Sequence, residues 1–205
     1  MTDQAASAER RPFGIWFVAF VIAMIGAGAL VTFAGIDDPI LAKGIMLMPL
    51  LFILKAGLNG IHNARLRPSA GGSANARYLA RMLMVTFLYV GSLFAALALI
   101  DEGDPVTIGT IVLAFLPGLA VAAYFWAIAR LMIELDDEFL RMLMVRQSLV
   151  ATAIALSAAS IYGFLENFGI VPHLAAFYWP IVWFAGLGIG AIVNKLTYGT
   201  TGEVR

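Results

Sequence analysis

The sequence predicts an all-α fold, a polytopic membrane helical bundle of six transmembrane helices. Hydrophobic residues make up 61% of the 205-residue chain and charged residues only 13%, so most side chains must be solvated by lipid rather than by water. Six apolar runs are each about as long as a helical bilayer crossing. None shows the alternation of apolar and polar residues that a transmembrane β-barrel requires.

The predicted helices follow one another with short connections. The apolar runs fall at about residues 13–35, 40–60, 80–100, 106–129, 147–165 and 173–194, separated by Gly, Pro and charged residues. The first run follows Arg10 and Arg11, as the apolar part of an export signal follows its basic residues. It is longer than the roughly 7–15 residues of such a segment. We therefore expect an uncleaved first transmembrane helix.

The composition of the connections predicts the domain organisation. We expect an N-terminal tail at 1–12, a first transmembrane hairpin at 13–63, a flexible linker at 64–77, a four-helix transmembrane core at 78–196 and a C-terminal tail at 197–205. The linker is predicted because residues 64–77 are small, polar and rich in glycine.

The basic residues predict the orientation in the membrane. One side of the six-helix arrangement carries Arg10, Arg11, Arg65, Arg67, Arg77, Arg81, Arg130, Arg141, Arg146, Lys195 and Arg205, whereas the other side carries only Lys43. Loops rich in Lys and Arg stay in the cytoplasm. Both termini are therefore predicted to be cytoplasmic, and the acidic turns at 37–38 and 101–104 lie on the opposite side.

The fourth predicted helix is expected to continue into the cytoplasm. Arg130, Glu134, Asp137 and Arg141 recur at spacings of four, three and four residues, which places them on one face of a continuous helix and allows ion pairs along it. We interpret this face as a cytoplasmic docking surface. The adjacent carboxylates are more typical of a solvated, ion-paired face than of a cation site, because no EF-hand spacing is present.

The six helices also resemble three copies of one hairpin. Each predicted hairpin has a turn proline and a second proline early in the returning helix: Pro39 and Pro49, Pro105 and Pro117, and Pro172 and Pro180. Two interpretations remain open. The hairpins descend from one repeat, or any row of membrane hairpins needs turn prolines and basic inner ends.

Four polar residues are candidates for an intramembrane pathway: Lys55, Asn59, Glu166 and His173. Lys55 lies inside the second span, where a charge either marks a functional site or reaches the headgroups along its own side chain. Asn59 follows one helical turn later. Glu166 and His173 flank the last far-side turn, where they could approach each other and either hold the turn or accept a proton.

Small residues predict close helix packing in the last two spans. Gly186 and Gly190 form a GxxxG motif, and Ala151, Ala155 and Ala159 continue the same spacing. Such stripes let helix backbones approach each other. The partner helix belongs either to this chain or to a second copy of it.

The sequence lacks the motifs of the common membrane enzymes. It contains no cysteine, no phosphate-binding loop, no H-E-x-x-H and no nucleophile elbow. We therefore predict no catalytic residue, no metal site and no cofactor. The equal numbers of basic and acidic residues, 13 each, give no reason to expect a nucleic-acid partner. Membrane lipids are the expected partners, with a homo-oligomer or another membrane protein as further possibilities.

The second half of the chain resembles a family of small, uncharacterised bacterial polytopic inner-membrane proteins. The resemblance rests on Glu-Leu-Asp-Asp-Glu-Phe-Leu-Arg at 134–141, Tyr-Gly-Phe-Leu-Glu at 162–166, Pro172, and Trp179-Pro180 with the glycine-rich segment after it. The family pattern has Gln-Arg-Arg where this chain has Phe139-Leu140-Arg141. The resemblance covers four helices from about residue 77 and implies a bacterial inner-membrane location without an assigned activity.

Three functional hypotheses follow from the sequence, and the last of them, a membrane enzyme that acts on lipid through the cytoplasmic acidic cluster, is disfavoured by the absence of catalytic motifs. The first is an integral inner-membrane protein without a catalytic site, which has a structural, assembly or regulatory role and a cytoplasmic helical docking surface. The alternative is a small-solute or proton-coupled transporter or channel, oligomeric, that uses the polar residues listed above.

Overall fold

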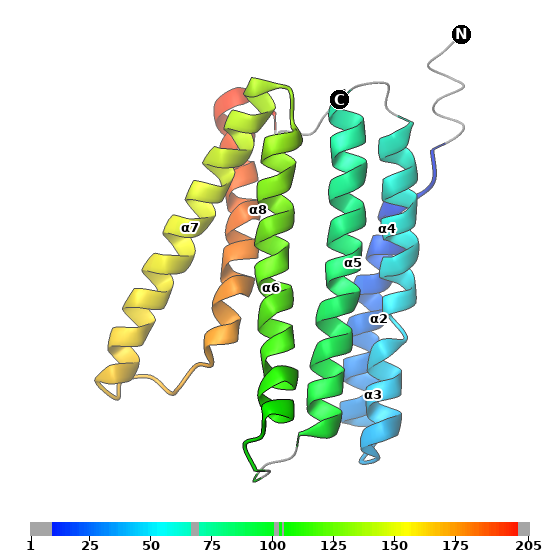
Figure 1. Cartoon of the computed structure of the whole chain (residues 1–205), viewed down its shortest axis with the longest axis vertical. Coiled ribbons are helices and arrows are strands. Elements are labelled where there is room, and N and C mark those ends of the chain that lie inside the picture. Colours follow the sequence, from blue (N-terminus) through cyan, green and yellow to red (C-terminus); the bar gives the residue numbers. More distant parts are fainter. Residues whose placement is uncertain (1–9, 67–69, 101–102, 104, 201–205) are drawn as a thin grey trace. The chain divides into compact units, whose positions relative to one another are not determined.

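The structure, a computed structural model, describes residues 10–66, 70–100, 103 and 105–200, and these form helices joined by short connections (Figure 1). The elements are α2 (Phe13–Phe33), α3 (Pro39–Leu47), α4 (Leu50–Arg65), α5 (Ala70–Leu99), α6 (Ile108–Glu134), α7 (Glu138–Asn167), the 3₁₀ turn η1 (Ala176–Tyr178) and α8 (Trp179–Tyr198). Six candidate spans among these residues have the length and apolar composition needed to cross a membrane. The all-α, six-span prediction is confirmed.

The chain forms two compact units, Met1–Thr86 and Phe87–Arg205, and the division falls inside α5. The flexible linker predicted at 64–77 is wrong for residues 64–65 and 70–77, because α4 continues to Arg65 and α5 already begins at Ala70. Its small residues pack rather than loosen the chain, since Ala74 and Ala76 are buried. Residues 67–69 of the predicted linker lie outside the described residues. The predicted tails at 1–12 and 197–205 lie largely outside them too.

The second predicted span, at 40–60, is interrupted at Pro49. It consists of α3 and α4, with a turn at Met48 and Pro49 between them. Proline has no N–H to donate, and its ring clashes with the carbonyl four residues earlier, so a helix usually kinks or breaks there. Pro117 lies inside α6, which continues past it, and Pro180 lies in the first turn of α8. The three returning prolines therefore do not have one common structural role.

In the first unit, α2 packs along α4, and glycines on α4 set how closely its neighbours approach. A Cβ at Gly60 would lie 3.2 Å from the Phe13 ring of α2, and one at Gly57 would lie 2.8 Å from Leu83 of α5. Side chains of the same unit fill the space beside both glycines. Close helix packing in this unit therefore depends on Gly57 and Gly60, which do not form a GxxxG motif.

In the second unit, α7 and α8 form a long antiparallel pair, and α6 joins them through aromatic side chains. The Phe125 ring of α6 lies 4.7 Å from Trp183 of α8, and Tyr124 lies 5.7 Å from Phe184. Figure 1 shows α6 and α7 meeting where one helix ends and the next begins, and separating toward their other ends. The α6–α7 junction is therefore a corner of the second unit.

Candidate functional site

The prediction that the fourth helix continues through Asp137 and Arg141 is wrong, because α6 ends at Glu134 and α7 begins at Glu138. The ion pair predicted between Arg130 and Glu134 is confirmed, with 3.2 Å between Arg130 Nη2 and Glu134 Oε1. Asp137 and Arg141 do not extend that face. The four residues predicted as one docking face are divided between the end of one helix and the start of the next.

Two of these residues instead build the α6–α7 junction, residues 130–141. The Asp137 carboxylate accepts hydrogen bonds from the N–H groups of Phe139 (2.8 Å) and Leu140 (3.1 Å) and caps the start of α7. Aspartate is a preferred N-cap because these N–H groups have no partner inside the helix. The cap satisfies the first turn of α7, so the chain leaves the helical conformation before Asp137 rather than continuing α6.

Arg141 donates hydrogen bonds to backbone carbonyls at the end of α6, on the other side of the break. Its guanidinium donates from Nε to the Met132 carbonyl (3.1 Å) and from Nη2 to the Leu135 carbonyl. These carbonyls lie at the end of α6, where the last four C=O groups have no intrahelical donor. Leu135 itself is buried. A side chain predicted to present charge to a partner therefore ties two helix ends together.

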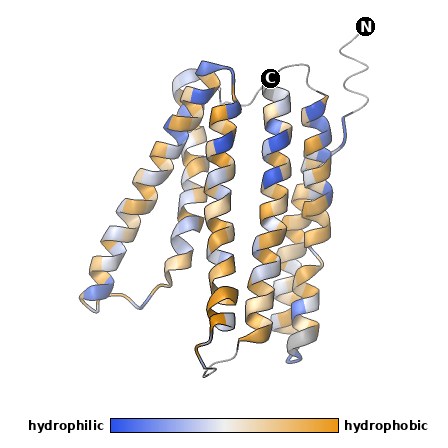
Figure 2. Cartoon of the chain, in the orientation of Figure 1, coloured by the Kyte–Doolittle hydropathy of each residue, from blue (hydrophilic) through white to orange (hydrophobic). Residues whose placement is uncertain are grey.

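Three acidic side chains at this corner are open to solvent, whereas that of Glu134 is only 12% exposed. Asp136, Asp137 and Glu138 are exposed, and Figure 2 shows the hydrophilic character of the α6–α7 junction against the apolar helices below it. Two large apolar side chains flank them, Ile133 at 68% and Phe139 at 46% exposure. The junction combines a fixed backbone with exposed carboxylates and apolar groups.

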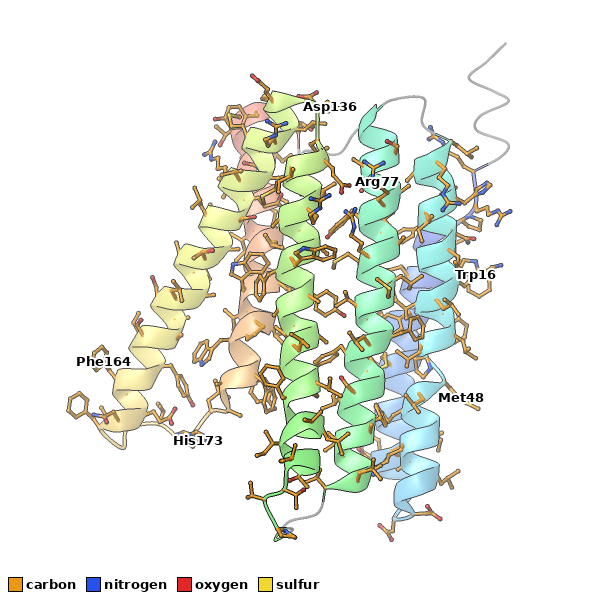
Figure 3. The ribbon with its side chains drawn as sticks, viewed as in Figure 1. Trp16, Met48, Arg77, Asp136, Phe164 and His173 are labelled. Carbon is orange, nitrogen blue, oxygen red and sulfur yellow. The ribbon has the colours of Figure 1, made fainter. Side chains whose placement is uncertain are left out.

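The pair predicted at the far-side turn is confirmed. His173 Nδ1 lies 2.6 Å from Glu166 Oε1, and Glu166 Oε2 accepts a hydrogen bond from the Leu174 N–H at 3.4 Å. The Tyr162 hydroxyl donates to the Pro172 carbonyl at 2.9 Å. Figure 3 places His173 on the connection between α7 and α8. Glu166 and Tyr162 thus hold this connection against the last turns of α7.

The other two pathway candidates do not form a pair. Lys55 is exposed on α4, whereas Asn59 is buried and donates from Nδ2 to the Pro12 carbonyl at 3.0 Å. Both belong to the first unit, and Glu166 and His173 belong to the second. Asn59 therefore has a structural contact of its own, between α4 and the start of α2.

Asn63 strengthens the same contact and was missed by the sequence analysis. Its Nδ2 donates to the Arg11 carbonyl, and its Oδ1 accepts from the Arg11 N–H, each at 2.8 Å. The spacing of Asn59 and Asn63, one helical turn apart on α4, could have indicated that the two side chains share one face. Recognising it required knowing that the chain before α2 lies beside α4.

We expect Asn63→Ala to loosen the chain that precedes α2. Two hydrogen bonds to one residue are lost, at about 1 kcal/mol each in net stability. Amide hydrogen exchange should show faster exchange of the Arg11 N–H while α7 is unchanged. Asn167→Ala, at the exposed end of α7, is the control and should leave Arg11 protected. Equal protection of Arg11 in Asn63→Ala and the wild type would contradict the expectation.

The GxxxG motif packs within the chain, so one of the two predicted partners is identified. A Cβ at Gly186 would lie 2.8 Å from the Ala151 Cα, and one at Gly190 would lie 2.8 Å from the Gln147 carbonyl oxygen. Hydrogen bonds cross the same contact in both directions. Gln147 Nε2 donates to the Leu187 carbonyl (2.8 Å), and Asn194 Nδ2 donates to the Leu143 carbonyl (2.9 Å).

Comparison with protein-family models, with curated proteins and with solved structures finds no match for this chain. The resemblance at 134–141 and 162–180 therefore remains a prediction. Among the described residues, no group of three or more His, Cys, Asp or Glu side chains could hold a metal ion. The polar side chains that could serve a function gather at the α6–α7 junction and at the α7–α8 connection.

Proposed function

We propose that this chain is a non-enzymatic, multi-pass bacterial inner-membrane protein that docks a partner protein through its α6–α7 junction, with both termini in the cytoplasm. The observation that carries the proposal is the built corner itself. Asp137 and Arg141 fix the backbone between two helices, while Asp136 and Glu138 stay exposed beside Ile133 and Phe139. A fixed surface loses little conformational entropy on binding.

The length of α7 supports an aqueous position for this corner. A 30-residue helix is about 45 Å long, whereas the hydrocarbon core is about 30 Å thick. The charged residues of the first turns of α7 are Glu138, Arg141 and Arg146, so this end is the one that extends beyond the hydrocarbon. The Arg146 guanidinium also lies over the Tyr198 ring at 5.0 Å, a pairing typical of the membrane–water boundary.

The chemistry of the corner predicts the chemistry of its partner. Exposed carboxylates attract Lys and Arg side chains, and exposed Ile and Phe side chains favour apolar anchors. The proposed partner therefore presents a basic segment with at least one large apolar residue. Arg130 pairs with Glu134 on the side of the corner, which leaves Asp136 and Glu138 as the residues that select for positive charge.

Photo-crosslinking in cells tests this proposal. A photoreactive phenylalanine analogue at Phe139 should give a discrete protein adduct, and Asp136→Lys with Glu138→Lys should abolish it. These two changes leave Asp137 and Arg141 intact, so the corner should stay folded. The matched control places the same analogue at Leu149, an exposed residue further along α7, and should give no discrete adduct. No adduct at Phe139, or one that survives charge reversal, would contradict docking.

The transport hypothesis has its own test. Protein in liposomes should carry no proton or solute flux if docking is its role. Flux that is lost in Lys55→Met or Glu166→Gln, while both variants remain folded, would support the alternative of a small-solute or proton-coupled transporter or channel instead.

A further inference from the structure

The connection between α7 and α8 is unusually apolar for a turn between two membrane spans. Residues 167–194 contain no Asp, Glu, Lys or Arg, and His173 is the only titratable side chain in residues 168–177. Large apolar side chains on it point outward, with Phe168 at 72%, Ile170 at 67% and Phe177 at 63% exposure. In water these three side chains would be costly to expose together.

Backbone groups at the start of this connection are hydrogen-bonded within the chain, as a medium with little water requires. After α7, Gly169 takes a positive φ of 70°, the Gly169 N–H bonds to the Glu166 carbonyl and the Ile170 N–H bonds to the Leu165 carbonyl, each at 2.9 Å. This is the Schellman arrangement, which satisfies the last carbonyls of a helix. Unsatisfied backbone groups are most costly where water is scarce.

Side chains satisfy the next part of the connection. Tyr162 donates to the Pro172 carbonyl, and Glu166 accepts from the Leu174 N–H. The remaining oxygen of Glu166 meets His173, so the two ionisable groups of the turn bond to each other. Polar groups near hydrocarbon pair in this way. The connection thus presents large apolar side chains outward, while its polar groups bond to one another, with the His173 side chain 81% and the Glu166 side chain 30% exposed.

The turn between α2 and α3 is different and serves as an internal comparison. It contains Asp37 and Asp38, both exposed, and Asp38 Oδ1 accepts from the Leu41 N–H at 3.1 Å. Both turns follow an odd-numbered candidate span, and the orientation predicted from the basic residues places both on the non-cytoplasmic side. One turn has the composition of a water-exposed loop, and the other does not.

We propose that residues 168–178 lie in the bilayer interface and bind lipid, with Phe168, Ile170 and Phe177 inserted at the boundary between headgroups and acyl chains. The occupant is lipid because the exposed apolar surface continues from two membrane-spanning helices. Phe164 on the last turns of α7 is 67% exposed and points away from the hairpin (Figure 3). Aromatic side chains are enriched at this depth of a bilayer.

The absence of cysteine from the chain allows a direct test. Single-cysteine variants Phe168→Cys and Asp37→Cys are labelled with an environment-sensitive nitrobenzoxadiazole dye and reconstituted in phosphatidylcholine–phosphatidylglycerol vesicles. At position 168 we expect blue-shifted emission, strong quenching by lipids brominated in the upper acyl chain, and several-fold weaker quenching by aqueous iodide than at position 37. Position 37 should show the opposite pattern.

Equal iodide quenching at the two positions, with no effect of brominated lipid at position 168, would overturn the proposal. Ile170→Cys repeats the test if Phe168→Cys does not fold, as judged by helical circular dichroism and monodispersity in detergent. The result is independent of partner docking, since the α6–α7 junction lies at the other end of α7 and is unchanged in these variants.

Discussion

Gly190→Ala should lower the free energy of unfolding by about 1–3 kcal/mol, the usual cost of forcing extra atoms into a packed contact. The added Cβ would meet the carbonyl oxygen and the Cα of Gln147, at 2.8 and 2.9 Å. Both are backbone atoms, which cannot rotate away as a flexible side chain does. The α7–α8 pair must therefore separate, which also lengthens the hydrogen bonds of Gln147 and Asn194 across it.

Gly188→Ala is the matched control, because Gly188 is on the same helix and its added Cβ would meet no atom within 4 Å outside the neighbouring backbone of α8. It should be neutral, or stabilising by up to about 1 kcal/mol through helix propensity. The midpoint of unfolding in mixed micelles of increasing dodecyl sulfate content measures both variants. If Gly190→Ala and Gly188→Ala unfolded at the same midpoint, the close approach of α7 and α8 would be wrong.

Arg141→Gln should destabilise the α6–α7 junction by about 2–3 kcal/mol. The change removes two hydrogen bonds from a charged donor, to the carbonyls of Met132 and Leu135, and each such bond contributes about 1.5–3 kcal/mol when well shielded. The guanidinium is partly exposed, so the sum is reduced by solvent screening. Hydrogen exchange should increase at the Leu135 and Phe139 N–H groups before it increases in α8.

Arg130→Gln is the control for the loss of one positive charge. Arg130 makes an exposed i,i+4 ion pair with Glu134, and such pairs contribute about 0.3–0.5 kcal/mol. Exchange at the junction should therefore stay close to wild type in this variant. Equal effects of Arg130→Gln and Arg141→Gln would show that charge, rather than the hydrogen bonds of Arg141, holds the corner.

Much of the candidate chemistry was predictable where it depends on local spacing. Arg130 and Glu134 are one helical turn apart inside a helix, and their ion pair forms. Glu166 and His173 flank one short turn, and they meet across it. The spacing of Gly186 and Gly190 predicted close packing, although which chain supplies the partner helix required coordinates.

The errors arose where a residue type fits two structures and its contacts in the folded chain select one of them. Asp137 fits equally well on a helical face and at an N-cap, and its carboxylate caps α7 while Arg141 supplies donors to the end of α6. Residues 70–77 have the composition of a linker, yet they are helical because their small side chains pack in the first unit. Asn63 holds the chain before α2 only because the fold places the Arg11 backbone beside it.

The sequence by itself determined that the chain is helical and has six segments long and apolar enough to cross a membrane, because the thickness and polarity of the bilayer set the length and hydrophobicity of a span. Tertiary structure alone decided that α6 and α7 break at an Asp137 cap, that Gly186 and Gly190 pack on α7 of the same chain, and that Glu166 secures an apolar turn. These depend on which hydrogen-bond partners and backbone contacts each side chain finds in the folded chain, which hydrophobic periodicity does not encode.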